Sequence, residues 1–160
     1  MATIYQTQGT DVTWKASGGT HVLTLTSLAN NAGRKGDSHD FGANFQRLVR
    51  VSLLTKFAIA PTLGKTLDVW WSSSVDGSNF SGALAAGDAA QNDSNIVYQM
   101  RRIGSLPVLA NTNAQSGSWV FPVYSRYGFP VLMNNATGQA LTATAGDHVL
   151  TITPISELVQ

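Results

Sequence analysis

The 160-residue sequence predicts an all-β fold, built as a two-sheet sandwich or a barrel. Short runs of β-branched and aromatic residues are separated by clusters of Gly, Asn, Asp and Ser, which is the pattern of strands joined by turns. No window sustains the i, i+3, i+4, i+7 apolar spacing of an amphipathic helix. The length suits a single domain that buries about 70% of the surface of its unfolded chain.

The first ten residues are predicted to form an arm. They contain only Ile4 and Tyr5 as sizeable apolar side chains and too few charges to be a solvated tail. We therefore expect residues 1–10 to become ordered against another chain. A single β-sandwich domain follows over residues 11–155, and residues 156–160 are predicted to be a C-terminal tail.

Strands are predicted next over residues 11–15 and 22–28, before a polar loop over residues 30–44. Long loops on a rigid β-scaffold often carry contacts with partners. The basic residues of this loop, Arg34 and Lys35, are therefore candidates for partner binding.

The same loop contains the run GDSHD, in which Asp37, His39 and Asp40 could supply oxygen and imidazole ligands. A metal site needs further ligands at matched distances. His21 and His148 stand in strand-like segments, and nothing in the sequence brings them to this loop. We therefore expect no metal site and no cofactor.

The clearest strand lies within residues 45–59, FQRLVRVSLLTKFAI. Apolar and polar side chains alternate along it, which indicates one face in the core and one face outside. The predicted core face consists of Val49, Val51, Leu53, Phe57 and Ile59.

Residues 66–74, TLDVWWSSS, repeat this alternation with Leu67, Val69 and Trp71 on the core face. Trp70 then falls on the polar face, where a bulky apolar side chain is costly to leave in water. We expect Trp70 to be covered by another subunit or by a loop.

The second half of the chain begins with a small, Gly- and Ala-rich loop over residues 76–94, which opens with a tight turn at Asp76-Gly77. Pro122 removes a ladder donor and predicts an edge strand or a bulge. Strands are predicted over residues 95–103, 119–125, 130–134 and 148–153, which brings the total to about eight.

Charge and composition argue against nucleic acid and membranes as partners. Charged residues make up 12% of the chain, against about 25% in a typical protein, and the formal net charge is +1. A net charge this small produces no electrostatic potential that would attract nucleic acid. Arg101 and Arg102 form only an isolated basic pair beside Tyr98. No apolar run approaches the roughly 20 residues that span a bilayer, and no export signal is visible.

Catalysis is equally poorly supported. The absence of cysteine excludes thiolate zinc sites and Cys nucleophiles. Ser78 in GSNFSG does not fit the G-x-S-x-G nucleophile elbow, and Glu157 is the only glutamate available for paired-carboxylate chemistry. We expect no enzyme activity, although a hydrolase using His39 stays open as a third alternative.

Four stretches give the second half a resemblance to a known group of proteins. They are LDVWWSSSVDGSNFSG, MRRIGSLPV, FPVYSRYGFPVLMNN and TGQALTATAGDHVLTITPI, and together they cover residues 67–155. Their pattern resembles that of tailed-bacteriophage virion proteins that decorate or cement the capsid. The resemblance implies an antiparallel jelly-roll β-sandwich that binds the capsid surface across junctions between major capsid protein subunits, as a homo-oligomer, a dimer or a trimer.

The neutral, site-poor sequence is compatible with such a structural role, in which many copies bind one lattice. The alternative is a receptor- or glycan-binding sandwich on a phage fibre or tail, with Trp70 or Tyr127 stacking against sugar. Aromatic residues at loop tips would favour that alternative. The candidate partner-binding residues are Ile4, Tyr5, Arg34, Lys35, Trp70 and Tyr127.

Overall fold

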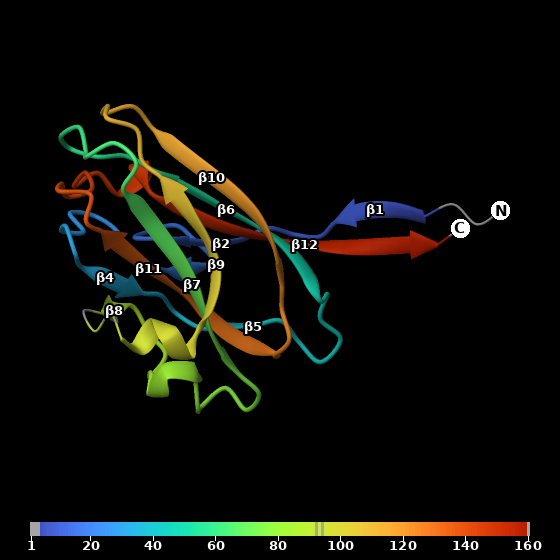
Figure 1. Cartoon of the computed structure of the whole chain (residues 1–160). Helices are drawn as coiled ribbons and strands as arrows, with labels where there is room; N and C mark the ends of the chain where they lie inside the picture. The colour runs from blue at the N-terminus through green and yellow to red at the C-terminus, as the bar shows by residue number, and fades with distance from the viewer. Residues whose placement is uncertain (1–3, 92, 94, 160) are drawn as a thin grey trace.

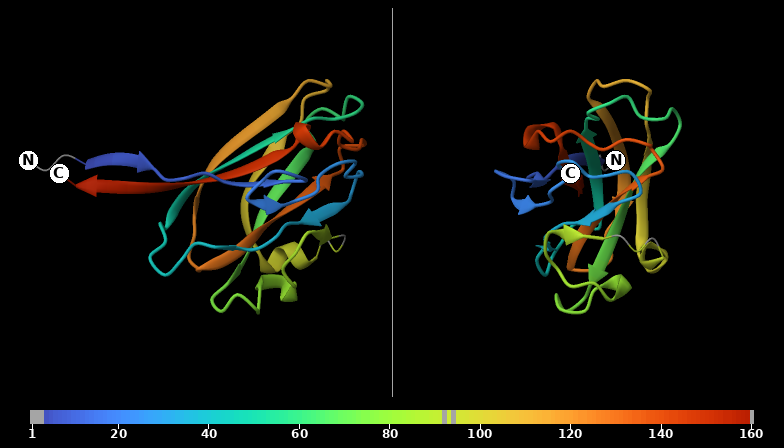
Figure 2. Two further views of the ribbon diagram at one scale, coloured as in Figure 1. Left: turned by 180° about the vertical axis from the view of Figure 1, so that it is seen from behind. Right: turned by 90° about the vertical axis from the view of Figure 1, so that its left-hand side faces the viewer.

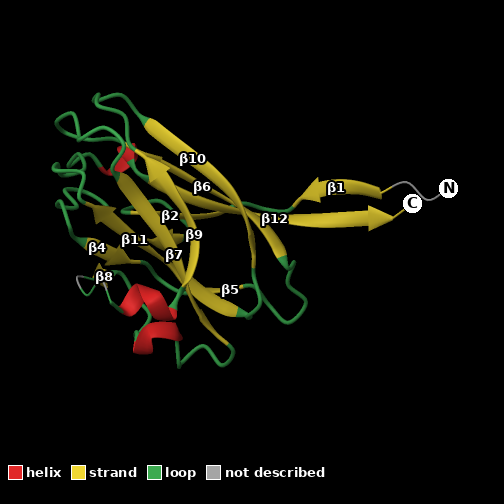
Figure 3. Ribbon diagram, in the orientation of Figure 1, coloured by secondary structure: helices red, strands yellow, loops and turns green. Residues whose placement is uncertain are grey.

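The computed structural model describes residues 4–91, 93 and 95–159, which fold into two packed β-sheets with short 3-10 turns (Figures 1 and 3). The described strands are β1 (Ile4–Gln8), β2 (Val12–Lys15), β3 (His21–Val22), β4 (Gly33–Lys35), β5 (His39–Asp40), β6 (Leu48–Thr55), β7 (Thr66–Ser74), β8 (Ala89–Ala90), β9 (Arg101–Pro107), β10 (Gln115–Pro122), β11 (Tyr127–Asn135) and β12 (Val149–Val159). The 3-10 turns are η1 (Ser81–Ala83), η2 (Ile96–Gln99) and η3 (Ala145–Asp147). None of these turns is long or apolar enough to cross a membrane.

The topology is that of a jelly roll. The first sheet has the order β10-β6-β12-β2-β3, and β1 pairs with the outer part of β12. The second sheet has the order β8-β4-β11-β7-β9, and β5 also pairs with β11. The strands β2, β12, β6 and β10 thus face β4, β11, β7 and β9, which is the two-sheet arrangement of a jelly roll. The predicted all-β, antiparallel, jelly-roll-like sandwich is confirmed.

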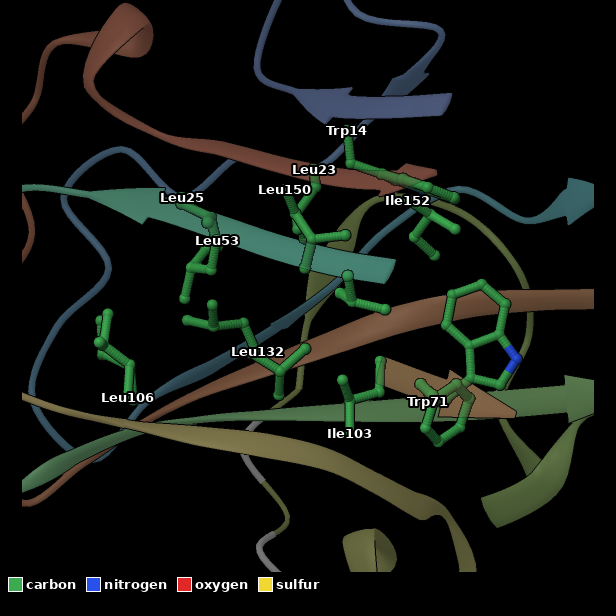
Figure 4. Packing of buried hydrophobic residues seen from close by; sticks show 14 of the residues in the cluster. Trp14, Leu23, Leu25, Leu53, Trp71, Ile103, Leu106, Leu132, Leu150 and Ile152 are labelled. Atoms are coloured by element: carbon green, nitrogen blue, oxygen red, sulfur yellow. The ribbon is translucent and has the colours of Figure 1, made fainter. Parts of the chain in front are cut away.

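The core lies between the two sheets, where the inward side chains of both layers meet (Figure 4). The alternation predicted for β7 is confirmed, because Leu67, Val69 and Trp71 are all buried. The labelled core residues in Figure 4 are Trp14, Leu23, Leu25, Leu53, Trp71, Ile103, Leu106, Leu132, Leu150 and Ile152. Burying such side chains between two apolar faces is the main stabilising contribution to the sandwich.

A second apolar cluster, the outer cluster, lies on the opposite face of the second sheet. There the segment that contains η1 and η2 folds over β11. The outer cluster consists of Phe80, Val97, Met100, Phe129, Val131 and Met133. β11 is therefore buried on both faces, which explains why its sequence YGFPVLMNN is a continuous apolar run and shows no alternation.

Several predicted element boundaries are wrong. Residues 95–103 begin with η2, because the Asp93 carboxylate accepts the backbone N–H of Asn95 at 2.8 Å and starts a turn. β6 ends at Thr55; Phe57 beyond it is buried in the core as predicted, but Ile59 is 62% exposed. The short strands β4, β5 and β8 lie in the two segments that were expected to be loops.

Two local predictions are confirmed. β10, which ends at Pro122, is an edge strand of the first sheet. Asp76-Gly77 forms a tight turn in which Gly77 has φ +76°. The Asp76 carboxylate accepts the backbone N–H groups of Ser78 and Asn79 at 2.8 and 2.9 Å, and these bonds hold the pKa of Asp76 well below its usual range.

Both ends of the described chain form one projection, the terminal ribbon, which consists of β1 and residues 155–159 of β12. β12 runs out of the first sheet and pairs with β1 in the antiparallel register Ile4↔Val159 to Gln8↔Ile155. Figures 1 and 2 show the ribbon extending far from the two layers. Residues 156–159, which the sequence placed in a tail, thus continue β12. Residues 4–8 of the expected arm pair with their own chain, and residues 1–3 lie outside the described part.

Candidate functional site

The outer face of the second sheet carries a cleft of about 530 Å³, here called the Trp70 cleft. It lies where β7, β9 and β11 meet η2 and the turn before β4. The residues that line it are Asn31, Asp68, Trp70, Val97, Tyr98, Arg102, Met133, Asn134 and Asn135. The volume falls in the range of about 300–1,000 Å³ that is usual for small-molecule sites.

Strand alternation and a bulge build the wall of this cleft. Asp68 and Trp70 point outward because their neighbours on β7 point into the core. The register between β7 and β9 shifts next to Trp70, so that Trp70 pairs with Arg102 while Val69 pairs with Gly104. A bulge of this kind re-aims side chains. The Arg102 guanidinium lies over the Trp70 ring, 5.7 Å from its centroid.

An ion pair supplies the polar groups of the cleft. The Asp68 carboxylate accepts hydrogen bonds from Arg102 Nη2 at 2.9 Å, from Asn135 Nδ2 at 3.2 Å and from the Ser105 hydroxyl. Burial of this carboxylate opposes its ionisation, but the bonds from Ser105, Arg102 and Asn135 outweigh burial and lower the pKa of Asp68. The two opposite charges leave the cleft with no net charge.

The rim beside β11 is held in an unusual backbone conformation. Asn31 has φ +59° and Ala136 has φ +55°, a region in which L-residues other than Asn and Asp are rare. Asn31 Oδ1 accepts the backbone N–H of Ala136 at 3.0 Å, and the backbone N–H of Asn31 donates to the Asn134 carbonyl at 2.8 Å. These bonds fix the position of the Asn31 amide at the cleft.

The two sheets are also joined by a histidine pair that was not expected from the sequence. His21 on β3 and His39 on β5 approach to 2.9 Å between Nε2 and Nδ1, and the His21 ring stacks on Trp14 at 5.1 Å. Burial lowers the pKa of both imidazoles, and the neighbouring His21 lowers that of His39 further. His148 lies elsewhere, bonded to Thr55. Within residues 4–91, 93 and 95–159, no group of three or more His, Cys, Asp or Glu residues could hold a metal ion.

Two of the candidate partner-binding residues make contacts within the chain. Arg34 Nε and Nη2 donate to the two carboxylate oxygens of Asp88 at 2.7 and 2.5 Å. Lys35 Nζ donates to the carbonyl of Ala85 and lies 5.9 Å from the centroid of the Phe129 ring. Both cations therefore tie the segment before β8 onto the second sheet.

The structure places the other candidates in three different regions. Trp70 on β7 is half-buried, lines the cleft and packs against the outer cluster, and Tyr127 also packs against the outer cluster. Ile4 and Tyr5 lie in β1 of the terminal ribbon, and their side chains are outside the described part.

Sequence reasoning missed Asp68, Tyr98 and Arg102 as components of a site. Two signals for them are present in the sequence. Asp68 shares the outward face of β7 with Trp70, and Tyr98 stands close to Arg102 in the chain. What the sequence does not contain is the bulge that aligns Arg102 with Trp70.

The terminal ribbon is the second candidate surface. Among the described residues, β1 pairs only with β12, and residues 156–159 of β12 pair only with β1. The ribbon therefore has an open backbone edge on each side. Thr7 and Ser156 lie opposite each other with their hydroxyl oxygens 3.1 Å apart, a cross-strand contact that fixes the register.

Comparison of the sequence with protein-family models and with characterised protein sequences gives no match.

Proposed function

We propose that this chain is a structural virion protein that binds the outside of a phage capsid, across junctions between major capsid protein subunits, and stabilises it. The observation that carries the proposal is the terminal ribbon. A two-stranded ribbon is marginally stable in water when it stands alone, and it becomes stable when further strands or another surface cover it. The ribbon is thus shaped to be completed by another chain.

The composition of β1 supports pairing through its edge. Proteins usually protect an open edge with charged residues, proline or a bulge. The β1 segment, IYQTQ, has no charge and no proline, and its register with β12 is regular. A strand from another protein can extend such an edge through backbone hydrogen bonds, with little demand on side-chain identity.

The two edges of the ribbon suit a position between subunits. One edge belongs to β1 and the other to β12, so a single ribbon can accept a strand on each side at the same time. A chain that joins two neighbouring capsid subunits links them by additive contacts, and many copies on a lattice raise the total resistance to rupture. Pairing of one β1 edge with that of a second copy would produce the homo-oligomer expected from the resemblance.

Capsids prepared with and without this chain provide the test. Purified full-length protein and protein lacking residues 1–8 are added to the bare capsids, and bound protein is measured after sedimentation at low and high salt. We expect the full-length protein to bind and to raise the temperature at which the particles break. Removal of β1 should weaken binding by at least about tenfold, because a strand-pairing surface is lost. Salt should change binding through the β1 edge little, because β1 carries no charged side chain.

Leu63→Ser is the matched control, since it removes an exposed apolar side chain, 66% accessible, from the loop between β6 and β7. This variant should bind like the full-length protein. Particles that break at the same temperature with and without the chain would overturn the proposal. Equal capsid binding by the protein lacking residues 1–8 would show that the ribbon is not the attachment site.

A further inference from the structure

We propose that the Trp70 cleft is a binding site for a neutral carbohydrate. This activity is separate from capsid attachment, since the cleft lies on the outer face of the second sheet and the ribbon extends from the first. The C-terminal end of β11 lines the cleft, and in Figure 1 this end of the strand points away from the ribbon. A copy attached through its ribbon therefore leaves the cleft open.

The cleft combines an aromatic platform with hydrogen-bonding groups. Tyr98 on η2 lines it with 82% of its surface exposed, and Trp70 provides an apolar wall beside it. Sugar rings have an apolar face of C–H groups, which stacks on an exposed aromatic ring, and an edge of hydroxyl groups, which needs polar partners.

Planar polar groups stand next to this platform. Hydroxyl groups of sugars both donate and accept, so a site for them needs carboxylate, guanidinium or amide groups in fixed positions. Asp68 is held by Arg102, Ser105 and Asn135, and Asn31 is held by the backbone of Ala136. Among the described residues, Arg102 uses only Nη2 in these bonds, which leaves its remaining N–H groups for a ligand.

The charge of the cleft selects a neutral ligand. Its lining contains one acid, Asp68, and one base, Arg102, and these two are already paired. An anionic sugar or a nucleic acid would meet the Asp68 carboxylate without a second cation to compensate for it. A neutral hexose or N-acetylhexosamine oligosaccharide meets no such repulsion.

The test uses the isolated full-length protein in native gels cast with dextran, mannan, galactan or water-soluble glycol chitin, with heparin as an anionic comparison. We expect at least one neutral glycan to retard the protein, and heparin to have no effect. Tyr98→Ala should weaken the retardation by about tenfold, because the exposed ring supplies the stacking surface. Tyr98 is on the surface, so this variant should melt like the parent.

Tyr124→Ala is the matched control, because Tyr124 is 67% exposed and stacks on Arg101, outside the lining of the cleft. It should bind the glycan as the parent does. Asp68→Asn, which keeps the shape of the side chain, should also weaken binding. Failure of the parent to bind any of the neutral glycans would overturn the proposal, and so would equal losses for Tyr98→Ala and Tyr124→Ala. Neither result depends on capsid binding.

Discussion

The terminal ribbon and the Trp70 cleft are built in opposite ways. The ribbon consists of two strands that project from the sandwich, and its surface is the backbone edge (Figure 2). The cleft is lined by outward side chains of β7 and β9, whose inward side chains form the core, together with residues of β11, η2 and the turn before β4. Changes in the ribbon should therefore leave the fold intact, whereas changes at the cleft should alter stability and binding together. The following predictions test this difference through the free energy of unfolding.

The largest effect is expected for Leu67→Ala. Leu67 is fully buried and adjoins Asp68 on β7, so its truncation leaves a cavity behind the cleft wall. We expect the free energy of unfolding in urea to fall by about 3 kcal/mol. Capsid binding by the folded fraction should be unchanged. A loss of capsid binding by the folded protein would show that the ribbon depends on the second sheet after all.

Trp70→Ala should have an intermediate effect. The side chain is half-buried and contacts both the outer cluster and Arg102, so its removal should lower the free energy of unfolding by about 1–2 kcal/mol. Glycan retardation should fall in the same variant. If stability falls but retardation does not, Trp70 is only a packing residue and the cleft depends on Tyr98 alone.

Mild acid should have a smaller effect, through the histidine pair. Burial lowers the folded-state pKa values of His21 and His39, against the raising effects of Asp37 on His21 and of Asp40 on His39. Burial also lowers the pKa of His148, although the hydrogen bond with Thr142 and the charge of Asp147 act to raise it. The unfolded chain therefore binds more protons at pH values below about 6.5, so stability is complete above that pH and falls as the pH drops toward the folded values.

Melting temperatures at pH 7.5 and 5.5 check this expectation. His39→Gln should reduce the difference between the two temperatures, because one member of the pair no longer titrates. A parent protein that melts at a higher temperature at pH 5.5 would contradict the direction of the shifts. Asp40 should not contribute in this range, since its bonds to Arg126 and Gly42 hold its pKa at about 2.

The smallest effect on stability is expected for removal of residues 1–8. Among the described residues, β1 pairs only with the part of β12 that projects from the sandwich. The free energy of unfolding should change by less than about 0.5 kcal/mol, as for a surface substitution. A loss of several kcal/mol would mean that the ribbon stabilises the sandwich and that the two regions are not independent.

The strands that could be predicted from the sequence are those with one face buried in the core and the other face exposed. β6 and β7 show this alternation directly, and their pattern alone indicates a sandwich. The 3-10 turn at residues 96–99 was missed because the β-branched residues Ile96 and Val97 favour a strand, while the bond from Asp93 imposes a turn.

The two candidate surfaces could be predicted only in part. Trp70 is visible as an apolar residue on a polar face, but its meeting with Asn31 and Asn135 depends on the order of strands in the sheet. The ribbon joins residues about 150 positions apart, and neither of its strands shows a strong local signal. The histidine pair likewise requires β3 and β5, which belong to different sheets, to meet at one margin.

The antiparallel register of the ribbon also determines how it carries mechanical load. Ile4 lies opposite Val159 at the tip, so a force that separates the two strands there breaks their hydrogen bonds one pair after another. A force along the strands, transmitted by a partner paired at the edge, loads all the residue pairs between Ile4 and Gln8 at once. The ribbon should therefore resist a force along its strands much more strongly than it resists peeling, and under the proposed function this would oppose sliding between neighbouring capsid subunits.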